Sequence, residues 1–268
     1  MMLLLTVIIF LLGLALGSFA NCLIWRLYKQ ESIIGRSYCP LCKNILRWYH
    51  NIPLFSYIFL KGRCYFCHKK ISWQYPLVEL GTALLFVVFF WQLLGFKYVP
   101  DGSLLLLLQG PSFYLYLIRD LVAAWAMTFI LVFDLRYYLV SNFVVWPASI
   151  FFIIINLVLG VIWWQILLSI AVAVLFFGLQ YLFTRGRGLG EGDIWLGLLL
   201  GSMFPDWGLL VTAILSAYLI GTLVGLSLII SGHKSWSSKL PLGVFLAIGA
   251  LLTLIWGENI IHYYLQLF

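Results

Sequence analysis

Charged residues, and acidic ones above all, are scarce in this 268-residue chain. Asp, Glu, Lys and Arg together make up 9% of the residues, and only nine residues are acidic. Hydrophobic residues make up 64%, a composition that excludes an ordinary soluble domain and a disordered chain. Because a carboxylate is costly to place in a membrane, an acidic residue at the end of an apolar run is a candidate functional group.

Long apolar runs are abundant. A bilayer core takes about 20 residues of helix to cross, and the sixth of eight such segments is short, so seven spans is an alternative count. No internal repeat is visible. We predict an all-α polytopic membrane protein with about eight transmembrane helices and one polar insert between the first two. The predicted helices cover residues 2–25, 76–95, 112–133, 142–161, 163–183, 193–204, 207–231 and 240–257.

The predicted domains are a first transmembrane helix (1–25), a polar insert (26–75) and a transmembrane core (76–268). Ser18 and Ala20 lie at a spacing similar to a signal-peptide cleavage site. However, the basic residues follow the first apolar run instead of preceding it. An uncleaved first helix is therefore expected.

Basic residues gather on one predicted side of the membrane. If the insert is cytoplasmic, alternation of the helices places 14 of the 16 basic residues inside and only Lys97 and Arg119 outside. This distribution accounts for the net charge of +7 without nucleic-acid binding, and it predicts an external N-terminus. The basic residues predicted inside are Arg26, Lys29, Arg36, Lys43, Arg47, Lys61, Arg63, Lys69, Lys70, Arg136, Arg185, Arg187, Lys234 and Lys239.

Four of the five cysteines lie in the insert as two Cys-x-x-Cys pairs. Cys39 and Cys42 form the first pair, and Cys64 and Cys67 follow after 21 residues. This arrangement is typical of a structural zinc site of four thiolates, because each tight turn supplies two ligands. Free thiols or a redox pair are alternatives, while a disulfide is disfavoured in the reducing cytoplasm. Cys22 is expected to be a packing residue.

Several polar residues flank the insert. Asn21 and Arg26 lie at the end of the first predicted helix, and Glu79 lies just inside the second. One interpretation is helix packing with an ion pair between Glu79 and Arg26 or another basic residue. A substrate-binding or methyl-transfer role for Glu79 is the other. His50 is expected to face the surface or a substrate, because four cysteines already complete a zinc site.

Two aspartates lie at the ends of predicted helices, far apart in the sequence. The structural interpretation is that Asp134 pairs with Arg136 and that Asp193 caps a helix. The predicted topology nevertheless brings both to one membrane face, where two carboxylates would share a proton. One would then activate water and the other polarise a peptide carbonyl, as in an aspartic protease. Gly190 and Gly192 would leave room for a close approach to Asp193.

The order of the motifs resembles that of the prepilin peptidases, also called type IV leader peptidases, which are membrane aspartic proteases with a GxGD signature. The match covers most of the chain, and no single motif carries it. The matching segments are Gly17-Ser18-Phe19-Ala20-Asn21 with Arg26, the four-cysteine insert, Asn51-Ile52-Pro53, Tyr75-Pro76-Leu77-Val78-Glu79, Asp134, Gly190-Glu191-Gly192-Asp193 and Pro241-Leu242-Gly243.

The resemblance implies that Asp134 and Asp193 are the catalytic pair and that the four insert cysteines bind zinc. The implied substrate is a prepilin or pseudopilin precursor with a short basic leader, cut after a glycine at the cytoplasmic face of the bacterial inner membrane. A second implied activity methylates the new N-terminus with S-adenosylmethionine. The sequence contains no glycine-rich nucleotide-binding fingerprint for that cofactor.

The chain departs from the family pattern at three places, none of which involves the aspartates. Tyr28 replaces a usual proline, Asn142 replaces a usual acidic residue, and Ala83 follows Thr82 where a glycine is usual. The last departure leaves methylation less strongly implied than cleavage, so a peptidase without methyl transfer is one alternative. An ion-coupled transporter that uses the buried aspartates and a zinc-domain scaffold are alternatives from other classes.

Overall fold

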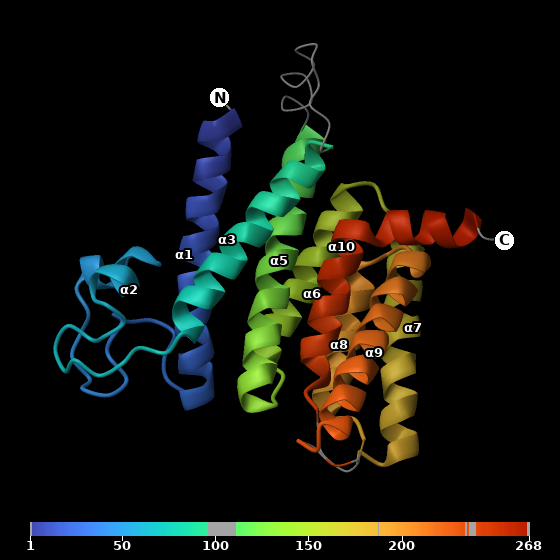
Figure 1. Cartoon of the computed structure of the whole chain (residues 1–268). Helices are drawn as coiled ribbons and strands as arrows, with labels where there is room; N and C mark the ends of the chain where they lie inside the picture. The colour runs from blue at the N-terminus through green and yellow to red at the C-terminus, as the bar shows by residue number, and fades with distance from the viewer. Residues whose placement is uncertain (1, 96–110, 187, 234, 236–239, 267–268) are drawn as a thin grey trace. The chain divides into compact units, whose positions relative to one another are not determined.

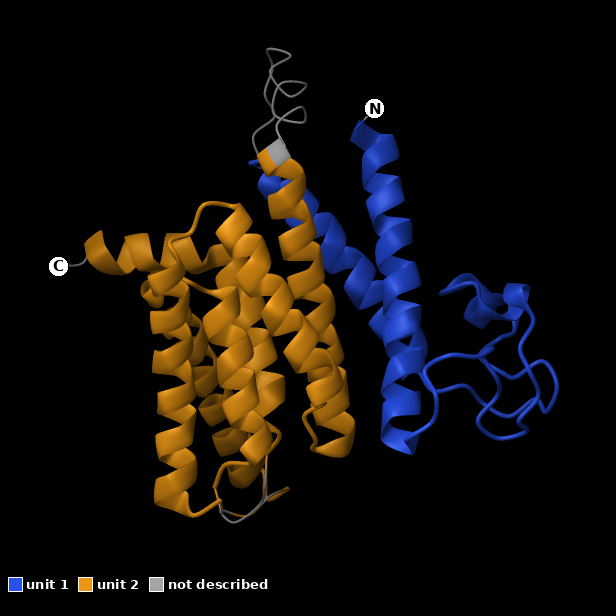
Figure 2. Cartoon of the chain, turned by 180° about the vertical axis from the view of Figure 1, so that it is seen from behind, with its two compact units in different colours: residues 1–104 blue, residues 105–268 orange. Residues whose placement is uncertain are grey.

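The computed structural model describes residues 2–95, 111–186, 188–233, 235 and 240–266, and within these ranges the chain is all-helical, with two isolated bridges and no strand. The chain divides into two compact units, residues 1–104 and 105–268 (Figure 2). The turn signals expected between residues 96 and 110 lie outside the described residues. The same holds for four basic residues of the topology count, Lys97, Arg187, Lys234 and Lys239.

The first unit holds two long helices, α1 (Met2–Lys29) and α3 (Gln74–Leu93), which pack against each other (Figure 1). Two glycines allow their backbones to meet. A Cβ at Gly13 would lie 2.5 Å from the Cα of Ala83, and a Cβ at Gly17 would lie 2.8 Å from the Cα of Glu79. Small residues four apart are a common way for membrane helices to pack closely.

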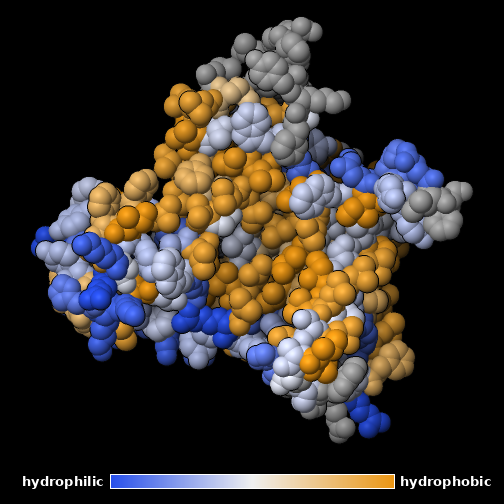
Figure 3. All heavy atoms as spheres, viewed as in Figure 1, coloured by the Kyte–Doolittle hydropathy of each residue, from blue (hydrophilic) through white to orange (hydrophobic). Residues whose placement is uncertain are grey.

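The insert between α1 and α3 contains little regular structure. Its two helical segments are η1 (Trp48–Asn51) and α2 (Phe55–Phe59). Figure 3 shows hydrophilic residues gathered over the insert, while apolar residues cover the sides of the long helices. The surface of the insert is therefore suited to water.

The second unit is a bundle of six helices within the described residues. In this bundle α7 packs on α8, α9 on α10, α5 on α10 and α6 on α8. Its helices are α5 (Pro111–Tyr137), α6 (Asn142–Val158), α7 (Trp163–Thr184), α8 (Glu191–Met203), α9 (Trp207–Ile230) and α10 (Leu242–Gln266), as Figure 1 shows.

The short helix α8 is held from two sides. A Cβ at Gly201 would lie 2.6 Å from the Cα of Ile170, so the backbones of α7 and α8 touch there. The side-chain amide of Asn156 on α6 donates to the carbonyl of Ser202 at 2.9 Å, and the hydroxyl of Ser169 on α7 donates to the carbonyl of Pro205 at 2.8 Å. These contacts fix the position of α8 and of the residues at its N-terminus.

Six described helices are long and apolar enough to cross a membrane: α1, α3, α5, α7, α9 and α10. The apolar helix α6 is shorter, with 17 residues. Helix α8 has 13 residues, which is about 20 Å of helix against a hydrocarbon core of about 30 Å. All eight predicted segments form helices, but the count of eight membrane spans is not confirmed.

The C-terminal helix is longer than expected. Helix α10 continues to Gln266, beyond the predicted end at residue 257, and Figure 1 shows its last part turned across the bundle.

Helix α9 has an apolar outer face. Its outward side chains include Leu215, Leu219 and Leu223, which are 57%, 65% and 68% exposed. Such exposed apolar faces are expected where lipid, not water, is the solvent.

The close packing of α7 on α8 can be tested by replacing glycines with alanine. Gly201→Ala should lower the free energy of unfolding by about 1–3 kcal/mol, because the new methyl group would overlap the backbone of Ile170. Gly178→Ala is the matched control, since a Cβ there meets nothing within 4 Å. Thermal unfolding in detergent measures both. Equal unfolding temperatures for the two variants would contradict the packing.

Candidate active site and metal centre

The two Cys-x-x-Cys segments of the insert have the same local structure. The N–H of Lys43 donates to the carbonyl of Cys39 at 2.8 Å, and the N–H of His68 donates to the carbonyl of Cys64 at 3.0 Å. Lys43 and His68 both adopt positive φ angles, of 60° and 54°. A bridge closes each loop, between Tyr38 and Ile45 in the first and between Arg63 and Lys70 in the second. Each loop is therefore a tight turn that directs two sulfur atoms to one point.

The four sulfur atoms form one group that suits a metal ion. They all lie within 4.8 Å of one another, and the Sγ atoms of Cys39 and Cys67 are 3.9 Å apart. Four thiolates around zinc, with Zn–S bonds of about 2.3 Å, require sulfur atoms about 3.8 Å apart. The donor set therefore fits a tetrahedral zinc ion. Cys22, which lies on α1, is not part of the group.

Hydrogen bonding affects the two buried sulfur atoms differently. Burial alone would raise the pKa of the Cys39 thiol, but hydrogen bonds from the backbone of Cys42 and Leu41 and from the side chains of Cys42 and Cys64 together lower the pKa to about 7. Burial raises the pKa of the Cys64 thiol above its usual value. Because metals bind the thiolate, a bound ion would favour the deprotonated form of both.

The polar residues that flank the insert do not form the predicted ion pair. The guanidinium of Arg26 donates to four backbone carbonyls, those of Ser32, Ile33, Gly35 and Arg36, at 2.6–3.1 Å. The carboxylate of Glu79 instead accepts from the N–H of Leu54 at 2.7 Å. Both residues hold the backbone of the insert to the helices that flank it. The ion-pair interpretation of Glu79 and Arg26 was therefore wrong, because Arg26 bonds to backbone carbonyls and Glu79 bonds to the N–H of Leu54 and the side chain of Ser18.

Asn21 has the packing role that was expected for the end of α1. Its side-chain amide donates to the carbonyl of Tyr75 at 3.1 Å, and its oxygen accepts from Gln74 at 3.1 Å. Asn21 is buried, so these bonds satisfy a polar group inside the α1–α3 contact.

His50 is buried, contrary to the expected surface position. Its side chain is 7% exposed, and its ring stacks on Tyr65 with centroids 4.5 Å apart and lies edge-on to Tyr49 at 4.4 Å. Its position depends on aromatic side chains brought together by folding, which local spacing does not reveal.

In the second unit, Asp134 lies near the end of α5, and its carboxylate points toward the start of α10. The side chain is 5% exposed, and Oδ2 accepts from the backbone N–H of Val244 at 3.1 Å. A Cβ at Gly243 would lie 2.8 Å from the same oxygen. Only glycine at that position leaves room for the carboxylate.

Asp193 is the third residue of α8 and not its cap. Its side chain is 9% exposed, and Oδ2 accepts from the N–H of Gly190, the residue that precedes the helix, at 2.9 Å. The N-cap interpretation was therefore wrong, because the carboxylate reaches back from the first turn. A carboxylate at this position is also stabilised by the positive end of the helix dipole.

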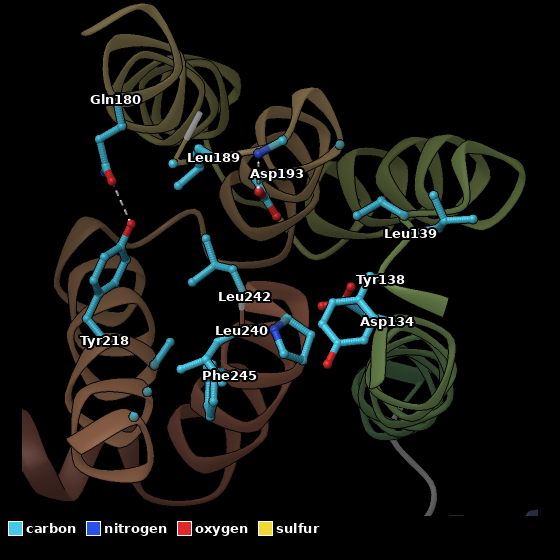
Figure 4. Close-up of a pocket in the computed structure, with 18 of the residues that line it drawn as sticks. Asp134, Tyr138, Leu139, Gln180, Leu189, Asp193, Tyr218, Leu240, Leu242 and Phe245 are labelled. Carbon is cyan, nitrogen blue, oxygen red and sulfur yellow. Dashed lines mark hydrogen bonds between the residues drawn. The ribbon is translucent and has the colours of Figure 1, made fainter. Parts of the chain in front are cut away.

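One cavity of about 1020 Å³ contains both aspartates (Figure 4). Asp134 and Asp193 enter it from α5 and α8, and residues of α7, α9 and α10 complete its walls. The turn after α5 contains Val140 and is part of the same wall. A Cβ at Gly192 would lie 2.8 Å from the Cβ of Val140. The absence of a side chain at Gly192 lets the two aspartate-bearing segments lie side by side. Asp134 and Asp193 thus line the same cavity, and their role as a catalytic pair stays a prediction.

Other residues of the cavity were not identified from the sequence. Tyr138 follows α5 with a positive φ of 56°, a conformation usually adopted by Gly or Asn. Gln180 and Tyr218 meet across the cavity from positions in the middle of apolar runs. A polar residue inside a predicted membrane helix is a usable signal, and it could have drawn attention to Gln180.

Two acidic side chains that line one apolar-walled cavity can titrate as a pair that holds one proton. Such a pair can activate a water molecule and polarise a carbonyl without a metal or a covalent intermediate. The four cysteines belong to the first unit, residues 1–104.

The metal site gives a test of its own. Purified protein should contain one zinc ion per chain, and Cys39→Ser and Cys64→Ser should each lose most of it, because three thiolates remain. Cys22→Ser is the matched control and should keep its metal. Elemental analysis of the intact protein measures the ratio. A ratio near zero in the parent, or the same loss in Cys22→Ser, would refute the four-cysteine site.

Comparison with known proteins agrees with this arrangement. Residues 11–93 match the family model of the bacterial peptidase A24 N-terminal domain, and residues 121–226 match that of the type IV leader peptidase family. No solved structure matches the chain.

Full-length relatives carry one name. The prepilin leader peptidase/N-methyltransferase of Pseudomonas aeruginosa is 31% identical over 284 residues, which cover 96% of this chain and 92% of that protein. The protein of the same name from Bacillus subtilis is 31% identical, with 97% and 98% covered. The one from Legionella pneumophila is 27% identical, with 95% and 92% covered. This chain therefore belongs to the type IV leader peptidase family.

Proposed function

We propose that this protein is a membrane-embedded aspartic endopeptidase that removes the short basic leader of type IV prepilin-like precursors. The observation that carries the proposal is the meeting of Asp134 and Asp193 in one cavity, in a chain of the leader peptidase family. The relatives' names add a second activity, N-methyl transfer, and we propose the new N-terminus as its target and S-adenosylmethionine as its methyl donor. We assign no residue to that cofactor.

The two aspartates would divide the work of hydrolysis. One carboxylate takes a proton from water, and the resulting hydroxide attacks the carbonyl carbon of the scissile bond. The other, protonated, donates a hydrogen bond to the carbonyl oxygen as negative charge develops there. Return of a proton to the leaving nitrogen breaks the peptide bond and restores the pair. The backbone bonds from Val244 and Gly190 hold both carboxylates in place throughout.

The residues around the two aspartates support hydrolysis by leaving room for the carboxylates or by holding them in place. Gly192 and Gly243 make room for Val140 and for the carboxylate of Asp134, and Gly190 supplies the N–H that holds Asp193. In the first unit, Asn21, Arg26 and Glu79 are best explained as residues that order the insert and its helices. Zinc on the four cysteines would stabilise that insert, which is small and has no long apolar run.

The distribution of basic residues supports an orientation in the bacterial inner membrane. The insert and the aspartate cavity would face the cytoplasm, and the N-terminus would lie outside. The leader of a precursor carried by one apolar helix would then reach the aspartates at the membrane surface. The division into a first helix, an insert and a protease core (1–25, 26–75 and 76–268) is kept as part of this proposal.

Replacement of either aspartate tests the peptidase directly. Asp134→Asn and Asp193→Asn should each slow cleavage of a precursor with a basic leader ending in glycine by about 10²–10⁴-fold, because an amide cannot take the proton from water. Asp206→Asn is the matched control, since Asp206 caps α9 outside the cavity and asparagine caps equally well. Purified protein and gel separation of precursor from product measure the rate. Cleavage by both variants at the parent's rate would end the proposal.

The methylation is tested with labelled S-adenosylmethionine. Precursor cut by the parent protein should carry label at its new N-terminus. A peptide that begins at the mature N-terminus should be labelled by Asp193→Asn as well, because the proposed role of the aspartate pair is confined to hydrolysis. Efficient cleavage without label on either substrate would show that the protein is a peptidase without methyltransferase activity.

A further inference from the structure

A polar pair forms the wall of the cavity across from Asp134. The hydroxyl of Tyr218 on α9 donates to the side-chain oxygen of Gln180 on α7 at 2.9 Å, as Figure 4 shows. The ring of Tyr218 also lies edge-on to Phe176, with centroids 5.9 Å apart. Hydrolysis by the two aspartates does not require this pair.

The pair lies where the bundle is least tightly closed. Helix α7 packs mainly along α8, and α9 packs mainly along α10, while α7 and α9 contact each other sparsely. Tyr218 is therefore a principal contact between α7 and α9 beside the cavity, through its bond to Gln180 and its contact with Phe176. A gap between two membrane helices at this point would open from the lipid to the aspartates.

Three small residues of α9 line the cavity on the side of the helix that faces α10. Ala217, Gly221 and Gly225 repeat every fourth residue, so they share one side of the helix. A Cβ at Gly221 would lie 3.2 Å from the ring of Phe245, and a Cβ at Gly225 would lie 3.2 Å from the side chain of Leu240. Ala217 is fully buried, and a Cβ at Gly249 of α10 would lie 2.8 Å from its backbone nitrogen, so α10 already packs against this side of α9.

The cavity also reaches the outer surface along α9. Thr222 and Leu226 line the cavity and are exposed, whereas the neighbouring Leu223 is exposed but does not line it. An apolar segment that moves in the bilayer could therefore enter along α9 without passing through water.

We propose that the gap between α7 and α9 is the lateral entry for the apolar segment of a membrane-anchored precursor. The segment lies along the exposed cavity-lining residues of α9, Thr222 and Leu226. Gln180 and Tyr218 then bind the main chain of the residues beside the scissile bond. This inference rests on the proposed function, because it names how the substrate reaches the same two aspartates.

The chemistry of the pair suits that role. A peptide bond inside a helix is closed to attack, so the residues around it must unwind, and their N–H and C=O groups then need partners in an apolar setting. Glutamine offers two donors and an acceptor, and tyrosine offers a donor and an acceptor. Without substrate the two side chains satisfy each other, and with substrate they exchange that bond for bonds to the unwound main chain.

Site-specific cross-linking tests the entry route. A benzophenone amino acid in place of Thr222, in an Asp193→Asn background that leaves the precursor whole, should form a photo-adduct with the precursor. The same amino acid in place of Leu223, one residue away and equally placed along the helix, should form several-fold less. Equal adduct at both positions, or none at Thr222, would overturn the proposal. Failure of the parent protein to cut the precursor at all would instead overturn the proposed function.

Kinetics test the binding role of the pair. Tyr218→Phe keeps the ring against Phe176 but removes the hydroxyl, so KM for the precursor should rise by about fivefold while kcat stays near that of the parent. Gln180→Leu should likewise raise KM and leave kcat near that of the parent. Tyr181→Phe, beside Gln180 on α7 and outside the cavity lining, should keep the parent's KM. An unchanged or lower KM in Tyr218→Phe would show that the bond only links two helices.

Discussion

A backbone N–H donated to each buried carboxylate is the interaction on which the second unit depends. A carboxylate in an apolar bundle is strongly unfavourable unless donors satisfy it. Here the donors are the N–H groups of Val244 and Gly190, which lie at the starts of α10 and α8. Because these donors belong to the main chain, the carboxylates are held by the ends of helices whose positions the packing of the bundle decides.

That packing rests on the absence of side chains at a few points. Gly192 admits Val140, Gly243 admits the carboxylate of Asp134, and Gly201 admits the backbone of Ile170. Between membrane helices the hydrophobic effect gives little driving force, so close contact and hydrogen bonds have to supply it. The same device joins α1 to α3 in the first unit at Gly13 and Gly17. In both units, glycine brings polar groups together where lipid would otherwise separate them.

The sequence predicted the chemical groups better than their partners. Asp134, Asp193 and the four cysteines could be identified because such residues are rare in an apolar chain and their spacing limits their use. The partner of Glu79 and the burial of His50 could not, because they depend on backbone and aromatic groups that only folding brings near. The helix segments followed from apolar run length, whereas the number of membrane spans did not, because α8 is too short to settle it.

The central claim is that Asp134 and Asp193 act as one pair that holds a single proton. The most direct measurement is the pH dependence of kcat/KM for one precursor, with the protein in lipid nanodiscs. Only the singly protonated pair is active in this account, so the profile should be bell-shaped, falling at low pH when both carboxyls are protonated and at high pH when neither is. A rate that rises with pH to a plateau would show that a single base suffices, and would contradict the paired mechanism.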